Sequence, residues 1–146
     1  MENNSLLDVQ HLSHMFHLKR KMTVKAIDDV SFQIKKGEIY GLVGESGSGK
    51  STVARCIMNI YKPSEGEIFY KGIPICKSKE FRKNRKMLQM TRQMIFQDSA
   101  SSLNPRMKIG DIVAEPLRIY SGKGRPGKKE IEKQLELVGL DRSYME

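Results

Sequence analysis

The sequence predicts an α/β fold organised around a phosphate-binding loop that connects a buried strand to a helix. Residues 44–52 satisfy the pattern G-x-x-x-x-G-K-[ST]. The short apolar run Ile39–Val43 precedes this loop and is typical of a buried strand. Val53 and Ile57 follow at helical spacing, so a helix is expected to begin near Lys50. A glycine- and serine-rich turn before an ordinary helix would explain neither the lysine nor the paired hydroxyls after it.

The residue types of the loop suit the binding of phosphate. Glycines allow backbone N–H groups to turn toward a phosphate, and the helix N-terminus adds its partial positive charge. The pattern predicts that Lys50 reaches the β- and γ-phosphates of a nucleotide and that the Ser51 hydroxyl ligates Mg²⁺. The predicted nucleotide-binding residues of the loop are Gly44, Glu45, Ser46, Gly47, Ser48, Gly49, Lys50, Ser51 and Thr52.

Composition indicates a folded, non-membrane chain. Of the 146 residues, 38% are hydrophobic and 29% are charged, which is typical of a globular domain. No apolar run is long enough to span a bilayer, and the first residues lack the basic start of a signal peptide. Cys56 and Cys76 form neither a C-x-x-C pair nor a disulfide framework, so a reducing cytoplasm is expected.

The net charge of +9 is concentrated in one segment. Between Lys77 and Arg92, seven cations face Glu80 alone, and they account for six of the nine excess positive charges. Such a run raises nucleic acid as a partner, but no stacking aromatics interleave beyond Phe81. A solvated helix face is therefore favoured, and no nucleic-acid partner is expected.

Three histidines invite a metal-site hypothesis that their spacing does not favour. His11, His14 and His17 recur every three residues next to a predicted strand. On a strand these positions do not share a face, and no cysteine or carboxylate completes a ligand set. No metal site is assigned to them.

Periodicity predicts the remaining elements. Strands are expected at Leu6–Leu12, Val30–Ile34, Glu67–Tyr70 and Arg92–Phe96. Helices are expected at Lys79–Lys86, at Ile109–Tyr120 and after Pro126. A turn is expected at Lys71-Gly72, a kink or break at Pro116, and a helix stop at Gly139.

Four segments in this order resemble the nucleotide-binding subunit of ABC transporters. They are the strand Val30–Ile34, KKGEIYGLVGESGSGKST (Lys35–Thr52), KPSEGEIFYKG (Lys62–Gly72) and MIFQD (Met94–Asp98). The continuation FQDSASSLNPRMKIGDIVAEPLRIY, through its SLNPRM and AEPL segments, is similar to the subfamily that imports oligopeptides and dipeptides, with nickel and glutathione importers as relatives. The resemblance covers the chain from about Leu6 onward. It implies an ABC-type P-loop NTPase (RecA-like) core with an antiparallel β subdomain.

The resemblance also implies roles for two residues outside the loop. In that family a glutamine at a strand end completes the Mg²⁺ shell and leads into the helical subdomain that touches the membrane partner. Gln97 occupies that position, so Ser51 and Gln97 are the expected Mg²⁺ ligands. An aromatic residue upstream of the loop stacks on adenine, and Phe16 is the best-placed candidate, with a plain core phenylalanine as the alternative. ATP and Mg²⁺ are the implied cofactors.

Several motifs of the family have no counterpart in these 146 residues. Nothing matches the SGGQ signature, no apolar strand ends in Asp-Glu, and the switch histidine is missing. Where Asp141 follows Leu140, Arg142 occupies the place of the catalytic glutamate. The chain is therefore expected to bind nucleotide without the groups that activate water, and no catalytic residue is assigned in it.

The resemblance predicts two domains. Residues 1–104 correspond to the N-terminal part of the nucleotide-binding domain, with the β subdomain, the Walker A loop and the Q-loop. Residues 105–146 correspond to the incomplete start of the helical subdomain. In the family fold, strands from the absent half flank the strand that feeds the loop. The isolated chain is therefore expected to be marginally stable or prone to aggregation.

One function is favoured over two alternatives. The chain resembles the N-terminal portion of a cytoplasmic ATP-binding subunit, peripheral on the inner face of the cell membrane, that drives peptide uptake. Its implied partners are a second ATP-binding subunit, identical or homologous, and transmembrane permease subunits reached through the Gln97 loop and the helical subdomain. Such a protein would be an ATPase at full length. The alternatives are a short nucleotide-binding module without turnover and, because of the Lys77–Arg92 charge, a nucleic-acid-linked P-loop ATPase.

Overall fold

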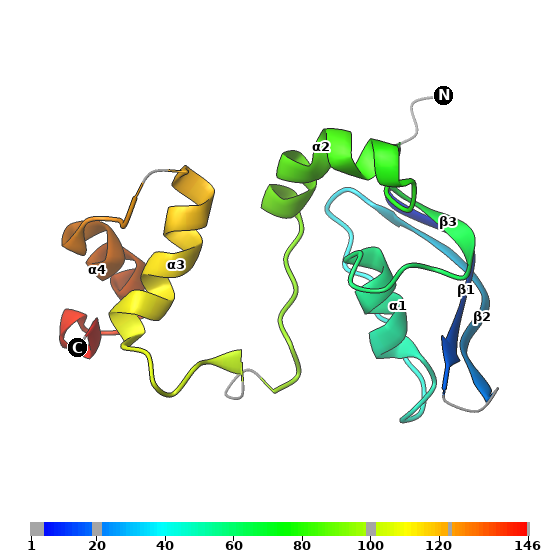
Figure 1. The fold of residues 1–146 in the computed structure, drawn as a ribbon, viewed down its shortest axis with the longest axis horizontal. Coiled ribbons are helices and arrows are strands. Elements are labelled where there is room, and N and C mark those ends of the chain that lie inside the picture. Colours follow the sequence, from blue (N-terminus) through cyan, green and yellow to red (C-terminus); the bar gives the residue numbers. More distant parts are fainter. Residues whose placement is uncertain (1–4, 19–21, 99–101, 123, 146) are drawn as a thin grey trace. The chain divides into compact units, whose positions relative to one another are not determined.

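The structure is a computed structural model that describes residues 5–18, 22–98, 102–122 and 124–145 (Figure 1). The chain forms two compact units, Met1–Gln93 and Met94–Glu146. Among the described residues, the first unit contains the strands and two helices, and the second contains only helical elements. The assignment of residues 1–104 and 105–146 to two parts of an ABC-type domain stays a prediction.

The first unit is built on an antiparallel sheet of four strands in the order β2-β1-β3-β4. The strands are β1 (Ser5–His17), β2 (Thr23–Lys35), β3 (Glu65–Tyr70) and β4 (Ile73–Pro74). They confirm the strands predicted at 6–12, 30–34 and 67–70 and extend each of them. Lys71 and Gly72 have φ values of 51° and 74°, so the predicted turn between β3 and β4 has both central residues in the left-handed region that tight hairpins favour.

Strand β1 bulges where it passes Gly66. Its register with β3 shifts between Gln10 and Ser13, and His11 within the bulge has a φ of 51°. A Cβ atom on Gly66 would lie 2.3 Å from the carbonyl oxygen of His11 and 2.5 Å from that of Gln10. Both distances are far below van der Waals contact, so the bulge requires glycine at this position of β3.

Side chains satisfy the polar groups of the bulge. The His11 N–H donates to Ser31 Oγ at 2.8 Å, and the Asp29 N–H donates to Ser13 Oγ at 3.0 Å. The His11 ring nitrogen Nδ1 lies 2.8 Å from Asp29 Oδ1. Hydroxyl groups thus replace the ladder hydrogen bonds that the bulge interrupts.

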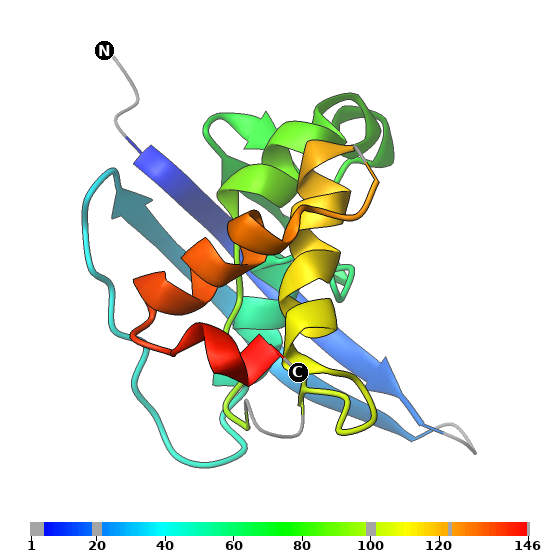
Figure 2. The ribbon, with the colours of Figure 1, turned by 90° about the vertical axis from the view of Figure 1, so that its left-hand side faces the viewer.

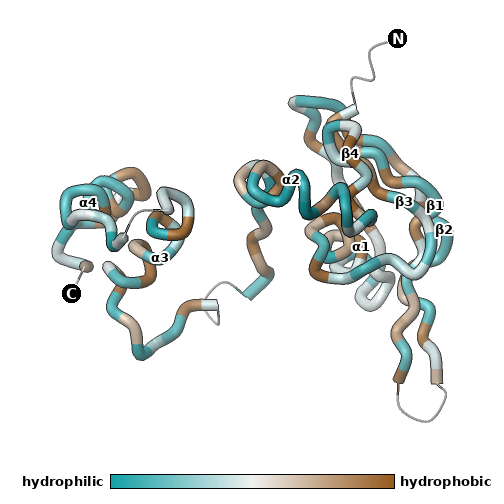
Figure 3. The backbone as a smooth tube through the Cα atoms, turned by 45° about the horizontal axis from the view of Figure 1, so that its top comes forward, coloured by the Kyte–Doolittle hydropathy of each residue, from teal (hydrophilic) through white to brown (hydrophobic). Residues whose placement is uncertain are grey.

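Two helices pack with the sheet to form the core of the first unit (Figure 3). They are α1 (Lys50–Ile57) and α2 (Ser78–Thr91). The cross-strand pairs Leu7–Tyr70 and Val9–Ile68 share a face because directly opposed residues do. The buried residues of this core are Leu7, Val9, Leu12, Ile27, Val53, Cys56, Ile68, Tyr70, Ile75 and Leu88.

Arg92 joins the end of α1 to the end of α2. Its Nη1 donates to the carbonyl of Ile57 at 2.6 Å and to Asn59 Oδ1 at 2.9 Å, and its guanidinium carbon lies 5.6 Å from the centre of the Tyr70 ring. Burial lowers the pKa of Arg92 from its usual value. The contact is favourable because the last carbonyls of a helix lack partners and carry partial negative charge.

Two predicted strands do not form. Ile39–Val43 and residues 92–96 adopt no strand, and α2 extends to Thr91. A strand needs a neighbour for its N–H and C=O groups, and neither segment pairs with another strand in the described part of the chain. Most of their side chains are consequently open to solvent: Ile39 is 98% exposed, Val43 is 95% exposed and Ile95 is 91% exposed.

The second unit packs three helical elements, α3 (Ile109–Ser121), α4 (Lys128–Leu137) and the 3₁₀ turn η2 (Arg142–Met145), against one another (Figure 2). Helix α3 continues through Pro116, so the break considered at that residue is wrong. The loss of one N–H donor does not end a helix whose other contacts hold it.

At the end of α4 the predicted stop is confirmed. Gly139 has a φ of 75° and donates to the Glu136 carbonyl, while Leu140 donates to that of Leu135.

Gly66→Ala is expected to lower the free energy of unfolding by about 3 kcal/mol or more, because the new methyl group would overlap two backbone carbonyls. Gly72→Ala is the matched control, since Gly72 also has a positive φ but its Cβ would meet nothing within 4 Å. Only the left-handed strain of about 1 kcal/mol is expected there. Urea unfolding of both variants measures the difference, and equal losses would contradict the role of the bulge.

Cys56 is expected to resist alkylation by iodoacetamide at neutral pH, whereas Cys76 reacts first. Cys56 is fully buried, and burial raises the pKa of its thiol to about 11, so the reactive thiolate is scarce. Burial also raises the pKa of Cys76, but its side chain is only half-buried. Peptide mass spectrometry measures both rates. The same reaction in urea is the control, because both thiols should then react alike.

Candidate phosphate-binding site

The loop of residues 44–49 turns directly into α1, which begins at Lys50 as the sequence predicts. Gly47 and Gly49 have φ values of 83° and 89°. These angles lie in the left-handed region that glycine adopts without steric cost. The two glycines therefore allow the backbone to reverse immediately before the helix.

Gly49 also makes the closest approach of the loop to the sheet. A Cβ atom on Gly49 would lie 2.2 Å from the carbonyl oxygen of Ala26 in β2. Any side chain at this position would push the loop away from the strand. At Gly44 a Cβ atom would lie 2.7 Å from Ser48 Oγ, so a second glycine keeps the two ends of the loop close together.

The Lys50 ammonium group lies inside the curve of the loop. Its Nζ donates to the carbonyls of Gly44 at 2.7 Å and Glu45 at 2.6 Å, and to Ser48 Oγ at 3.2 Å. An ammonium group has three N–H donors, and the loop therefore supplies an acceptor for each of them. The lysine holds the loop in a curved shape with its positive charge at the centre.

The first turn of α1 offers donors to an anion. The N–H groups of Lys50, Ser51 and Thr52 have no preceding helical carbonyl, because the first turn of any helix lacks them. No side chain caps this end, and the first turn contains no acidic residue. Free donors, the helix dipole and the Lys50 charge together suit a phosphate group, so the residues fit the predicted nucleotide.

A hollow of about 310 Å³ lies between the loop and the sheet. Gly47, Ser48, Gly49, Lys50, Ser51 and Thr52 line it from the loop side. Phe16 of β1 and residues 24–26 of β2 line it from the sheet side. Its volume is at the low end of the range for small-molecule sites. Phe16 is thus adjacent to the predicted phosphate site.

Phe16 has aromatic neighbours as well as the hollow. Its ring meets the His14 ring edge-on at 4.7 Å and the Tyr61 ring edge-on at 5.4 Å between centroids. His14 stacks on Tyr61 at 5.5 Å, and its Nδ1 lies 3.1 Å from the Lys62 carbonyl oxygen. This cluster fixes the orientation of the half-buried Phe16 ring. Adenine stacking by Phe16 stays a prediction.

The sheet-side lining by Val24, Lys25 and Ala26 was not predicted. Pairing of the two strands as a hairpin could have indicated this lining, because Val24 is the direct partner of Phe16. Gln97 lies at a bend in the second unit with its side chain exposed. Its role beside Ser51 at Mg²⁺ stays a prediction.

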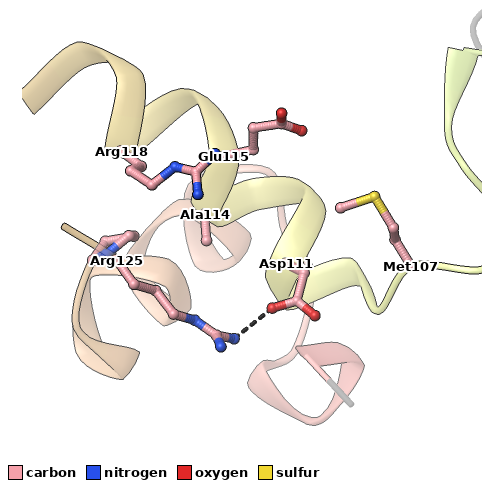
Figure 4. A pocket seen from close by; sticks show the side chains of 7 residues that line it. Met107, Asp111, Ala114, Glu115, Arg118 and Arg125 are labelled. Atoms are coloured by element: carbon pink, nitrogen blue, oxygen red, sulfur yellow. Dashed lines mark hydrogen bonds and ion pairs between the residues drawn. The ribbon is translucent and has the colours of Figure 1, made fainter. Parts of the chain in front are cut away.

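The second unit contains a hollow of its own, of about 360 Å³ (Figure 4). Met107, Ala114 and Pro126 contribute apolar lining, and two acids and two arginines contribute charge. Arg125 forms an ion pair with Asp111 across it. Because two carboxylates balance the two arginines of this lining, the hollow has no marked preference for an anion.

Comparison with protein families gives one match over most of the chain. The family described as ABC transporter matches residues 27–145. In the described part of the structure, no helix combines the length and the apolar character that crossing a membrane requires.

Comparison with individual proteins also finds ATP-binding proteins of transporters. The chain is 46% identical to the oligopeptide transport ATP-binding protein OppF of Bacillus subtilis, covering 95% of this chain and 46% of that protein. It is 44% identical to OppF of Haemophilus influenzae, covering 92% and 43%. Among solved structures, it is similar to the dimeric ATP-binding cassette MJ0796 in a post-hydrolysis state bound to ADP and Pi. That likeness has a TM-score of 0.70 and 25% identity and covers 90% of this chain and 55% of that one. The chain thus spans less than half the length of these curated relatives.

Proposed function

This chain belongs to the ABC transporter family, and from that premise we propose that it forms the nucleotide-phosphate-binding part of an ATP-binding subunit of a peptide importer. The observation that carries the proposal is the arrangement of Lys50, the loop glycines and the free N–H groups of α1 around one hollow. The similarity to OppF proteins supports peptides as the transported class.

Each part of the site has a proposed task. The backbone N–H groups from Gly47 to Thr52 would hold phosphate oxygens, and Lys50 would exchange a loop carbonyl for an oxygen of the β- or γ-phosphate. Phe16 would stack on adenine at the far side of the hollow. Ser51 and Gln97 would hold Mg²⁺, whose chemistry is to neutralise charge on the phosphates. We assign no general base, so the proposal for these residues is nucleotide binding, with hydrolysis as an activity of the whole subunit.

The proposed partners follow from the relatives. The solved MJ0796 cassette is dimeric, which supports pairing with a second ATP-binding subunit, identical or homologous. Transport of oligopeptides by the OppF relatives supports contact with membrane permease subunits. We propose that the Gln97 loop and residues 105–146 make this contact, with the subunit on the inner face of the cell membrane.

Lys50→Ala is expected to weaken binding of Mg²⁺-ATP by at least about tenfold, because charged hydrogen bonds to phosphate contribute roughly 1.5–3 kcal/mol. Titration with a fluorescent ATP analogue measures this. Lys36→Ala removes an equally charged, exposed lysine outside the hollow and should leave the affinity unchanged. Circular dichroism melting checks that loss of the three loop hydrogen bonds has not unfolded the variant. Wild-type affinity in Lys50→Ala would overturn the proposal.

Phe16→Ala separates base recognition from phosphate recognition. Stacking on a base contributes about 1–3 kcal/mol, so affinity for ATP should fall by about tenfold. Affinity for inorganic tripolyphosphate, which has no base, should stay unchanged. Equal losses for both ligands would mean that Phe16 acts through the fold as a core residue, and no loss for either would remove it from the site.

A further inference from the structure

Helix α2 has one side in the core and one side in solvent. Leu88 is buried in the core of the first unit, and Phe81 and Met87 pack against that core. Half-buried Asn84 lies between Phe81 and Leu88, and these three positions follow one another at intervals of three and four residues, as the inner side of an amphipathic helix requires. The strongly hydrophilic remainder of α2 is visible in Figure 3.

The outer side of α2 is cationic. All charged residues of this outer side are exposed. Glu80, the only acid of α2, is half-buried at the edge of the inner side. Lys77, just before the helix, does pair with Glu67. Within the described ranges, however, no carboxylate forms an ion pair with the cations of the outer side, which are Lys79, Arg82, Lys83, Arg85 and Lys86.

These five cations form two rows along the helix. Lys79, Lys83 and Lys86 follow one another at intervals of four and three residues and face solvent. Arg82 and Arg85 form the neighbouring row and line a hollow of about 480 Å³ between α2 and residues 59–63. This hollow is separate from the nucleotide site.

The hollow beside the arginine row is both cationic and apolar. Lys62 adds a third cation to its lining, and none of the described residues that line it is a carboxylate. Its apolar lining comes from Pro63, Ile75 and Phe81. A site of this kind matches a molecule with a phosphate next to a hydrocarbon part, because guanidinium groups bind phosphate bidentately and the apolar wall excludes water.

We propose that the outer side of α2 and its hollow form a docking surface for an anionic phospholipid membrane. The lysine row supplies attraction to the negative surface, and the arginine row holds headgroup phosphates at the hollow. The inner side of α2 is occupied by the core, so the helix adheres to the surface and does not insert. The proposal does not depend on nucleotide binding, because neither cationic row lines the nucleotide site.

Nucleic acid would be attracted by the same positive charge, but it fits the hollow less well. Recognition of single strands needs free aromatic faces for the bases. The two aromatic residues of the hollow are already engaged: Phe81 packs against the core, and Tyr61 stacks on His14 at 5.5 Å and lies 5.7 Å from the Arg55 guanidinium. The lysine row contains no aromatic residue.

The test is sedimentation of the full 146-residue chain with vesicles of pure phosphatidylglycerol or pure phosphatidylcholine. Binding is expected only to phosphatidylglycerol and should weaken with salt. The triple variant Lys79→Gln, Lys83→Gln, Lys86→Gln should bind about a hundredfold more weakly, at about fivefold per cation. Arg82→Lys with Arg85→Lys retains the charge but loses bidentate geometry, and should bind more weakly than the unchanged chain.

A matched control separates this surface from the net charge of the chain. The control is a second triple variant, Lys128→Gln, Lys129→Gln, Lys133→Gln. It removes the same number of positive charges from exposed positions of α4, and vesicle binding should change little. Equal weakening in both triple variants, or equal binding to phosphatidylcholine, would overturn the proposal.

Release from vesicles by glycerol phosphate would assign the hollow to a free anion instead, and release by duplex DNA would assign the surface to nucleic acid. Either result would also overturn it. ATP titration of the variants keeps this test distinct from that of the nucleotide site.

Discussion

The close approach of Gly49 to the Ala26 carbonyl is the constraint on which the nucleotide site depends. It places the phosphate-binding loop directly on β2, with no room for a side chain between them. Because β1 pairs with β2, the same contact brings Phe16 to the rim of the hollow that the loop lines. The bulge in β1 and the glycine opposite it then set the course of that strand.

The Lys50 ammonium makes the loop a preorganised site. A flexible loop of glycines and serines would lose much conformational entropy when it closes around a phosphate. Here the loop is already curved, since three acceptors of its own surround the ammonium. Less ordering remains to be done on binding, and that favours affinity. The same lysine therefore serves the loop before binding and would serve the phosphate afterwards.

Two kinds of exposed surface in the first unit have different physical meanings. Ile39 and Val43 are exposed because a strand without a neighbour cannot form, so their exposure reflects missing hydrogen-bond partners for the backbone. The cations of α2 are exposed although the helix itself is well anchored through Leu88 and its neighbours. An anchored element that keeps an unpaired charged side offers a defined surface to a partner, which an unpaired strand does not.

Local sequence alone determined the loop, the start of α1 at Lys50, the turn at Lys71-Gly72 and the stop at Gly139. Each depends on backbone conformations or caps that a few neighbouring residues specify. The tertiary structure decided what depends on distant residues. It placed Phe16 and Ala26 beside the loop, and it left Ile39–Val43 without a strand, because contacts across a sheet join residues far apart in the chain and apolar patterning does not supply a strand with its neighbour.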